Sequence, residues 1–260
     1  MYLNKIVAHK RSELSFARDA KVDWHERLEQ KSVNKIPFVQ SLRGNQPGEP
    51  SIIAEMKRAS PSKGSFSFGG DVAQQVASYE KGGARACSIL TNQHFFQGTL
   101  EDLSTARTGT QLPLLRKDFL IAAWEIAQAK VYGADAILLI AAILTNTELE
   151  TMIDEAHKCD LEVLLEIHDQ EELDRVLHLN SAPDAVGINN RNLNTFEVDL
   201  ETTAQLAEGL PKEICRVSES GFAKRSDLMR FHKVVDAFLI GEHLMKSEKP
   251  EQTLRGWVKG

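Results

Sequence analysis

The stretch AEMKRASPSKG, residues 54–64, places charged and turn-forming residues directly after the apolar pair Ile52-Ile53. Glu55 and Lys57 are two residues apart, and side chains alternate between the faces of a strand, so these two point the same way. A carboxylate beside an ammonium group can exchange protons with a bound reactant. Proline and glycine then shape a loop. We therefore expect Glu55 and Lys57 to project together from the carboxyl end of this strand.

Other apolar runs of the chain also end in polar, aromatic or glycine residues. Taken one at a time, each has an ordinary explanation: Lys57-Arg58 would be a solvated pair, and Asn189-Asn190 would be turn residues. Asn189 and Arg191 are again two apart and share a face. Explaining each residue separately does not account for two lysines, several acids, an asparagine and an arginine that all lie at the ends of apolar runs. The residues concerned are Ser60 in the first loop, Lys117 and Phe119 in LLRKDF, Leu138 in AILLI, Glu166 in EVLLEIHD, Asn189 and Arg191 in GINNRNL, Glu219, Ser220 and Gly221 in SESG, and Gly241 in FLIGEHL.

The elements that must position these residues are short apolar runs with regular spacing. Eight runs recur at intervals of roughly 22–35 residues, which is the spacing of strands that alternate with helices. Strict alternation predicts a parallel sheet with helices outside it. A count of eight favours a closed (β/α)8 TIM barrel, and a doubly wound open sheet is the alternative. The runs are Ile52–Met56, Ala86–Leu90, Leu112–Leu115, Ala136–Ile140, Val163–Ile167, Ala185–Ile188, Ile214–Val217 and Ala237–Ile240.

The first part of the chain differs from the rest. Residues 1–48 are predicted to form an N-terminal helical extension of the same domain, and residues 49–260 the barrel. We expect the extension to lie across the mouth of the barrel as a partial lid. Within the barrel, Asp71 and Thr147 are predicted helix caps, the second with a glutamate three residues on, as in a capping box.

Composition excludes several classes of protein. The chain has 260 residues and a net charge of -6, with no long block of one sign, so nucleic acid and anionic membranes are not expected partners. Cys87, Cys159 and Cys215 are far apart, which predicts neither a disulfide framework nor a zinc site and favours a reducing compartment. Signal-peptide and membrane-spanning segments are not evident. We expect a soluble cytoplasmic protein, a monomer or weak homo-oligomer, without a metal.

Glycines at the last two strand exits indicate a phosphate site. Loops after these strands of a barrel commonly bind phosphate through backbone N–H groups and the start of a short helix. Gly221 and Gly241 would allow the backbone to approach it closely. The predicted ligand is therefore a small phosphorylated molecule.

The chain resembles the indole-3-glycerol phosphate synthase family from about Ile52 to Met245, and its N-terminal extension resembles that of the family. The resemblance implies ring closure of an anthranilate-linked deoxyribulose phosphate, with loss of carbon dioxide and water and without a cofactor. The segments that carry the resemblance are IIAEMKRASPSKG, LLRKDF, GADAILLIAAIL, LLEIHD, GINNRNL, SESG and FLIGEHLM.

The resemblance also implies roles for individual residues. Lys117 would donate a proton to the ketone oxygen, and we expect burial and the like charge of Lys57 to lower its pKa. Lys57 and Glu166 would serve as acid and base, and Glu55 would either orient the lysines or share in the proton transfer. The implied catalytic residues are Glu55, Lys57, Lys117, Glu166 and Asn189; the substrate-binding residues are Ser60, Phe96, Phe119, Leu138, Arg191, Glu219 and Ser220; the phosphate-binding residues are Ser60, Gly221, Gly241 and Glu242.

One position departs from a common pattern of the family. Many members have a small residue such as serine after the last glycine, where this chain has Glu242. A carboxylate would repel phosphate, so we expect its side chain to turn outward. Two other functions stay open: an isomerase barrel such as phosphoribosylanthranilate isomerase, and a non-catalytic ligand-binding barrel. The isomerase would need a cysteine at a strand exit, where this sequence has none.

Overall fold

Eight parallel strands close into a barrel in the computed structural model, which describes residues 2–16, 21–31, 35–44, 48–61, 63–66, 70–193 and 195–260. Their order around the barrel is β1-β10-β9-β8-β7-β6-β5-β4. This closure confirms the predicted (β/α)8 barrel and excludes the open sheet. The strands are β1 (Ser51–Met56), β4 (Ala86–Leu90), β5 (Leu114–Lys117), β6 (Ala136–Ile140), β7 (Glu162–Ile167), β8 (Ala185–Asn189), β9 (Cys215–Glu219) and β10 (Ala237–Ile240).

The third barrel strand differs from its prediction. It begins at Leu114 and not at Leu112, because Pro113 has no N–H to donate to the ladder and is confined to the strand's start. The shift makes Lys117 the last residue of β5. Its side chain therefore has a fixed direction at the carboxyl end of the barrel.

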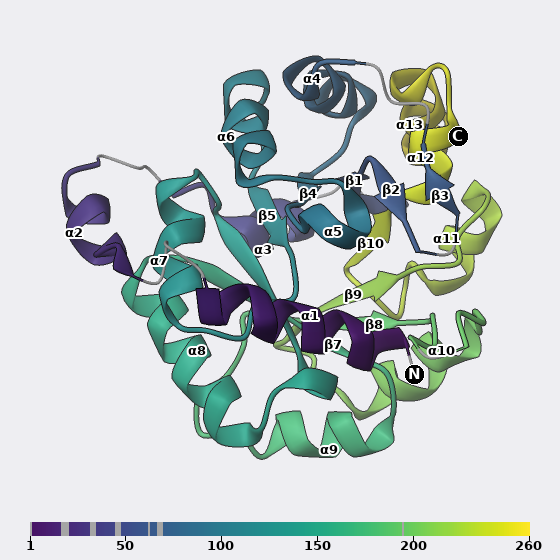
Figure 1. The fold of residues 1–260 in the computed structure, drawn as a ribbon. Helices are drawn as coiled ribbons and strands as arrows, with labels where there is room; N and C mark the ends of the chain where they lie inside the picture. Colours follow the sequence, from purple (N-terminus) through teal and green to yellow (C-terminus); the bar gives the residue numbers. More distant parts are fainter. Residues whose placement is uncertain are drawn as a thin grey trace.

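Helices surround the barrel in Figure 1. Asp71 caps α4 as predicted, accepting a hydrogen bond from the N–H of Ala73. The cap of α8 is Thr145 with Glu148 and not Thr147, because the helix begins earlier than its apolar pattern. The surrounding helices are α4 (Val72–Gly82), α5 (Gln93–Phe96), α6 (Leu100–Gly109), α7 (Trp124–Val131), α8 (Asn146–Lys158), α9 (Gln170–Leu177), α10 (Glu201–Gly209), α11 (Arg225–Phe231), α12 (Glu242–Lys246) and α13 (Pro250–Lys259).

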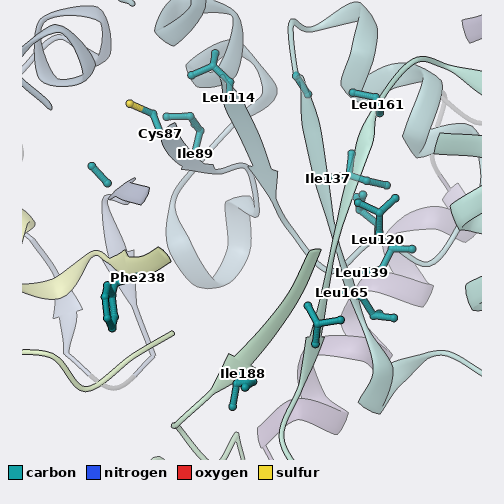
Figure 2. Packing of buried hydrophobic residues seen from close by; sticks show 14 of the residues in the cluster. Cys87, Ile89, Leu114, Leu120, Ile137, Leu139, Leu161, Leu165, Ile188 and Phe238 are labelled. Atoms are coloured by element: carbon teal, nitrogen blue, oxygen red, sulfur yellow. The ribbon is translucent and has the colours of Figure 1, made fainter. Parts of the chain in front are cut away.

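The apolar core has two layers because each strand is buried on both faces. In β1, Ile52 and Ala54 pack outward against the helices, and Ile53 between them packs inside the barrel. Figure 2 shows part of the outer layer, including Cys87 and Ile137. The strands thus form a rigid frame, and the side chains at their carboxyl ends inherit its geometry.

The N-terminal extension contacts both ends of the barrel. Its helices are α1 (Tyr2–Phe16), α2 (Trp24–Glu29) and α3 (Phe38–Arg43). In Figure 1, α1 crosses in front of the barrel, and its residue Leu3 lines the cavity described below. At the opposite end, Phe38 and Leu42 of α3 are fully buried among the first residues of the strands. The lid is therefore α1, whereas α3 closes the base.

The loop after β1 contains a small hairpin of β2 (Ala59–Ser60) and β3 (Gly64–Ser65). Residue 62 of this loop and residues 67–69 lie outside the described part of the chain. Across the described ranges, no helix combines the length and the apolar character needed to cross a membrane.

Candidate active site

A cavity of about 430 Å³ opens at the carboxyl ends of the strands. Every residue predicted for the site lines it, although the strands that supply them are far apart in sequence. Residues from α1 close one side. The predicted residues in its wall are Glu55, Lys57, Ser60, Phe96, Lys117, Phe119, Leu138, Glu166, Asn189, Arg191, Glu219, Ser220, Gly221, Gly241 and Glu242.

Lys117 lies between two buried carboxylates. Its Nζ atom is 3.2 Å from Oε2 of Glu166 and 3.2 Å from Oε2 of Glu219. Burial opposes the charge of Lys117, but Glu219, Glu166 and Glu55 together outweigh it and raise the lysine pKa above its ordinary value. The expectation of a lowered pKa is therefore wrong. The like charge expected to lower it, on Lys57, is paired with Glu55.

The two carboxylates that share Lys117 have opposite pKa shifts. Burial opposes ionisation of Glu166, but Lys117, His168 and Asn189 outweigh it and hold the pKa of Glu166 far below its ordinary value. Burial raises the pKa of Glu219 to about 7, with added repulsion from Glu166 and Glu55 against the attraction of Lys117. Such a division of neighbouring groups is typical of acid–base sites. Glu166 is the permanent anion, and Glu219 can carry a proton near neutral pH.

Glu55 and Lys57 form a second pair at the end of β1, as their spacing predicted. The Nζ atom of Lys57 donates to Oε1 of Glu55 at 2.6 Å. Gly241 makes room for this pair, because a Cβ at that position would overlap Oε1 of Glu55 and touch Nζ of Lys57. Its φ of -121° needs no glycine. A side chain at position 241 would therefore clash with the Glu55–Lys57 pair. Sequence reasoning did not indicate this steric role of the glycine.

The end of β8 supplies an amide and a guanidinium. The side-chain amide of Asn189 donates to Oε1 of Glu166 at 3.2 Å, and its oxygen accepts from the N–H of Arg191 at 3.0 Å. The guanidinium of Arg191 donates to the carbonyl of Phe196. Asn189 thus fixes the carboxylate of Glu166, and Arg191 presents a cation to the cavity.

An apolar wall faces the charged groups. The rings of Phe96 and Phe119 have centroids 6.2 Å apart and are tilted by 34°. Leu138 on β6 and Tyr2 on α1 line the same cavity. This surface suits a flat aromatic group, held beside Lys117.

The end of the cavity beside β9 and β10 carries several cations. Ser220 and Gly221 have left-handed backbone, with φ of 68° and 93°, a conformation that is strained for serine. The carboxylate of Glu242 does not turn away from the site: it lines the cavity, 2.6 Å from Nζ of Lys246 and 3.7 Å from Nζ of Lys63. The other oxygen lies 3.9 Å from Arg191. Glu242 is therefore surrounded by three cations, and its expected outward orientation is not found.

Sequence reasoning missed His168, Lys63 and Lys246. His168 lies 3.1 Å from Glu166, and only its place in LLEIHD, one residue beyond the strand, could have pointed to it. Lys63 lies in a polar loop and gave no signal, whereas Lys246 could have been found from its i,i+4 spacing to Glu242. Among the described residues, one group could hold a metal ion, His25, Glu155 and Cys159, and none of the three lines the cavity.

The closed parallel barrel, with a charged cavity at the carboxyl ends of its strands, places the chain among the (β/α)8-barrel proteins. Residues 3–256 match the family model described as indole-3-glycerol phosphate synthase. The chain belongs to this family. Relatives named indole-3-glycerol phosphate synthase include that of Polaromonas naphthalenivorans, 44% identical over 95% of both chains. That of Bacteroides thetaiotaomicron is 42% identical over 99% of this chain and 97% of the relative.

A solved structure supports the fold alone. The thiamine phosphate pyrophosphorylase of Pyrococcus furiosus superimposes with a TM-score of 0.61, covering 86% of this chain and 96% of that one. The two sequences are 16% identical. The likeness extends to the barrel and carries no information about the reaction.

Proposed function

We propose that this protein acts as an indole-3-glycerol phosphate synthase in tryptophan biosynthesis. It would convert 1-(2-carboxyphenylamino)-1-deoxyribulose 5-phosphate into indole-3-glycerol phosphate, carbon dioxide and water. The observation that carries the proposal is the family match over residues 3–256, joined to the pairing of Lys117 with Glu166 and Glu219.

In the first step, the ring carbon that bears the carboxylate attacks the ketone carbon, and Lys117 donates a proton to the ketone oxygen. The three carboxylates near Lys117 keep it protonated and ready for this step. A lysine held by carboxylates is a weak acid, so the substrate must displace part of this pairing. Protonation of Glu219, whose pKa is about 7, would release one of the two contacts.

Loss of carbon dioxide then restores the aromatic ring, and loss of the new hydroxyl as water completes the indole. Lys57 is the acid for the hydroxyl, since Glu55 orients its ammonium group at 2.6 Å. Glu166 is the base for the departing proton: it is ionised in the resting site, and its pKa rises once Lys117, its main counter-charge, has given up its proton. Asn189 holds this carboxylate and presents its amide to the substrate hydroxyls.

Substrate binding divides between an apolar and a cationic end. Phe96, Phe119 and Leu138 would contact the anthranilate ring. Arg191 would pair with an anionic group of the substrate, because its planar fork matches a carboxylate or phosphate. The phosphate would bind beside Ser60, Ser220, Gly221, Gly241 and the backbone of Glu242, with Lys63 and Lys246 adding positive charge.

The isomerase alternative has less support. All three cysteines are described and buried, and none lines the cavity. Burial raises the pKa of Cys215 to about 12, which suits a thiol inside a core. Their free state fits the reducing cytoplasm in which we place this activity.

The test is direct conversion of the substrate by the purified chain. Incubation should produce indole fluorescence together with one equivalent of carbon dioxide. Phosphoribosylanthranilate, the substrate of the isomerase alternative, should be left unchanged. Conversion of the second compound and not the first would reject the proposal in favour of the isomerase.

A further inference from the structure

His168 lies behind the candidate active site, between two carboxylates. Its Nε2 atom is 3.1 Å from Oε1 of Glu166, and its Nδ1 atom is 3.1 Å from Oε2 of Glu172. The backbone N–H of His168 donates to the same oxygen of Glu172 at 2.8 Å. The ring is therefore fixed from both sides, by β7 and by α9.

The contact between Nε2 of His168 and Glu166 has the distance of an ion pair but not the angle of a hydrogen bond. Its strength therefore depends on charge. Burial opposes that charge, but Glu166 and Glu172 outweigh it and raise the pKa of His168 to about 10. A ring between two carboxylates carries a proton on each nitrogen at neutral pH.

His168 is not part of the wall of the first cavity around Lys117 and Phe119. It lines a second cavity on the α9 side of the barrel mouth, which shares Asn189 and Arg191 with the first. The charged groups that face this second cavity from other positions are Asp169, Glu172, Arg191, Glu197 and Asp199. The contact of the ring with the first cavity is therefore made through Glu166.

We propose that His168 is a positioning residue whose imidazolium ring holds the carboxylate of Glu166 ionised and aims its second oxygen at Lys117. This inference rests on the proposed function of the same site. With Oε1 held by His168 and Asn189, Oε2 is left 3.2 Å from Nζ of Lys117. When Lys117 gives up its proton, Glu166 loses that counter-charge. The imidazolium remains beside Glu166 as its counter-charge and keeps the carboxylate in place for its later role as base.

Two measurements test this role. Nitrogen-15 NMR of histidine-labelled wild-type protein, with His168→Gln to assign the signal, should show both ring nitrogens protonated at pH 8. In kinetics, His168→Gln should lower kcat by about tenfold or more, leave KM within about twofold, and move the acid limb of the kcat profile up by about one pH unit, since a lost cation raises the pKa of Glu166. The matched control is His157→Gln, which breaks an exposed imidazole–carboxylate contact of 3.0 Å with Asp184.

A neutral ring at pH 8 would overturn the inference, and so would a folded His168→Gln variant with the wild-type pH profile. If that variant fails to fold, His168→Asn replaces it, both to assign the NMR signal and for the kinetics. Failure of the wild-type protein to convert the substrate would reject the proposed function. It would leave the measured charge of the ring unaffected.

Discussion

Lys117 and Glu219 form a buried ion pair in which Nζ lies 3.2 Å from Oε2, yet the pKa of Glu219 is raised to about 7. Burial of the Glu219 carboxyl is the main cause of this result, and repulsion from Glu166, the second carboxylate on Lys117, adds to it. Burial and repulsion between the two carboxylates exceed what one lysine can compensate. The site therefore holds one firm anion and one group that titrates near neutral pH.

Glu219→Gln should raise the melting temperature at pH 8. The folded state binds a proton at Glu219 up to about pH 7, whereas an unfolded glutamate releases it near about 4.3. The free energy of unfolding therefore falls as pH rises from about 4.3 to about 7. Glutamine cannot ionise, so the variant keeps the stability that the wild-type protein loses. The gain should shrink toward pH 4, and exposed Glu208→Gln on α10 is the control. Lower stability at pH 8 would mean that attraction to Lys117 outweighs burial.

Gly241→Ala should lower kcat by about 100-fold, because a misplacement of about 1 Å at a catalytic group has an effect of that size. The new Cβ would overlap the Glu55 carboxylate and displace Lys57. These are ends of flexible side chains, so the melting temperature should change little. Gly256→Ala on α13, where a Cβ has open space, is the matched control. Unchanged turnover would show that the Glu55–Lys57 pair tolerates movement.

Glu242→Gln should tighten binding of inorganic phosphate, measured by calorimetry, by up to about fivefold. The change removes a negative charge from a partly exposed cluster of cations, where one pair contributes up to about 1 kcal/mol. Glu251→Gln breaks a comparable pair with Arg255 on α13 and should have no effect. Weaker binding in Glu242→Gln would show that the glutamate orients Lys63 or Lys246 for phosphate.

The two ends of the N-terminal extension should respond differently to truncated side chains. Leu42→Ala in α3 removes a fully buried side chain and should destabilise the protein by about 2–5 kcal/mol without changing KM. Tyr2→Ala in α1 removes part of the cavity wall and should raise KM with little loss of stability. Unfolding by denaturant and steady-state kinetics on both variants check this pair. Equal effects on KM would contradict separate roles.

Much of the fold followed from the sequence because burial on both faces makes each strand an uninterrupted apolar run. The residues at the strand exits could be predicted as well, because side chains alternate between the two faces of a strand. This alternation places Glu55 on the same side as Lys57, and Asn189 on the same side as Arg191. The exceptions were β5, where Pro113 displaced the start of the strand, and β9, which was expected at Ile214–Val217 and runs over Cys215–Glu219. The cap at Thr145 was missed because the apolar pattern of α8 begins after the helix does.

The electrostatics of the site did not follow from the sequence. The pKa of Lys117 depends on how many carboxylates three other strands bring to it, and a linear pattern contains no such distances. For the same reason Glu242 was expected to turn outward, since its partners Lys63 and Arg191 come from separate segments. Only Lys246, four residues on in α12, lay within reach of a helical-spacing argument. His168 was overlooked because one histidine beyond a strand has many possible surroundings.

The most direct test of the central claim, that Lys117 is the proton donor for ring closure, is the single-turnover rate of indole formation in Lys117→Ala against wild type. Circular dichroism would first confirm that the variant is folded. A general acid contributes about 10²–10⁴-fold, so we predict a loss of that size at saturating substrate. A rate near that of the wild type would contradict the assignment of Lys117.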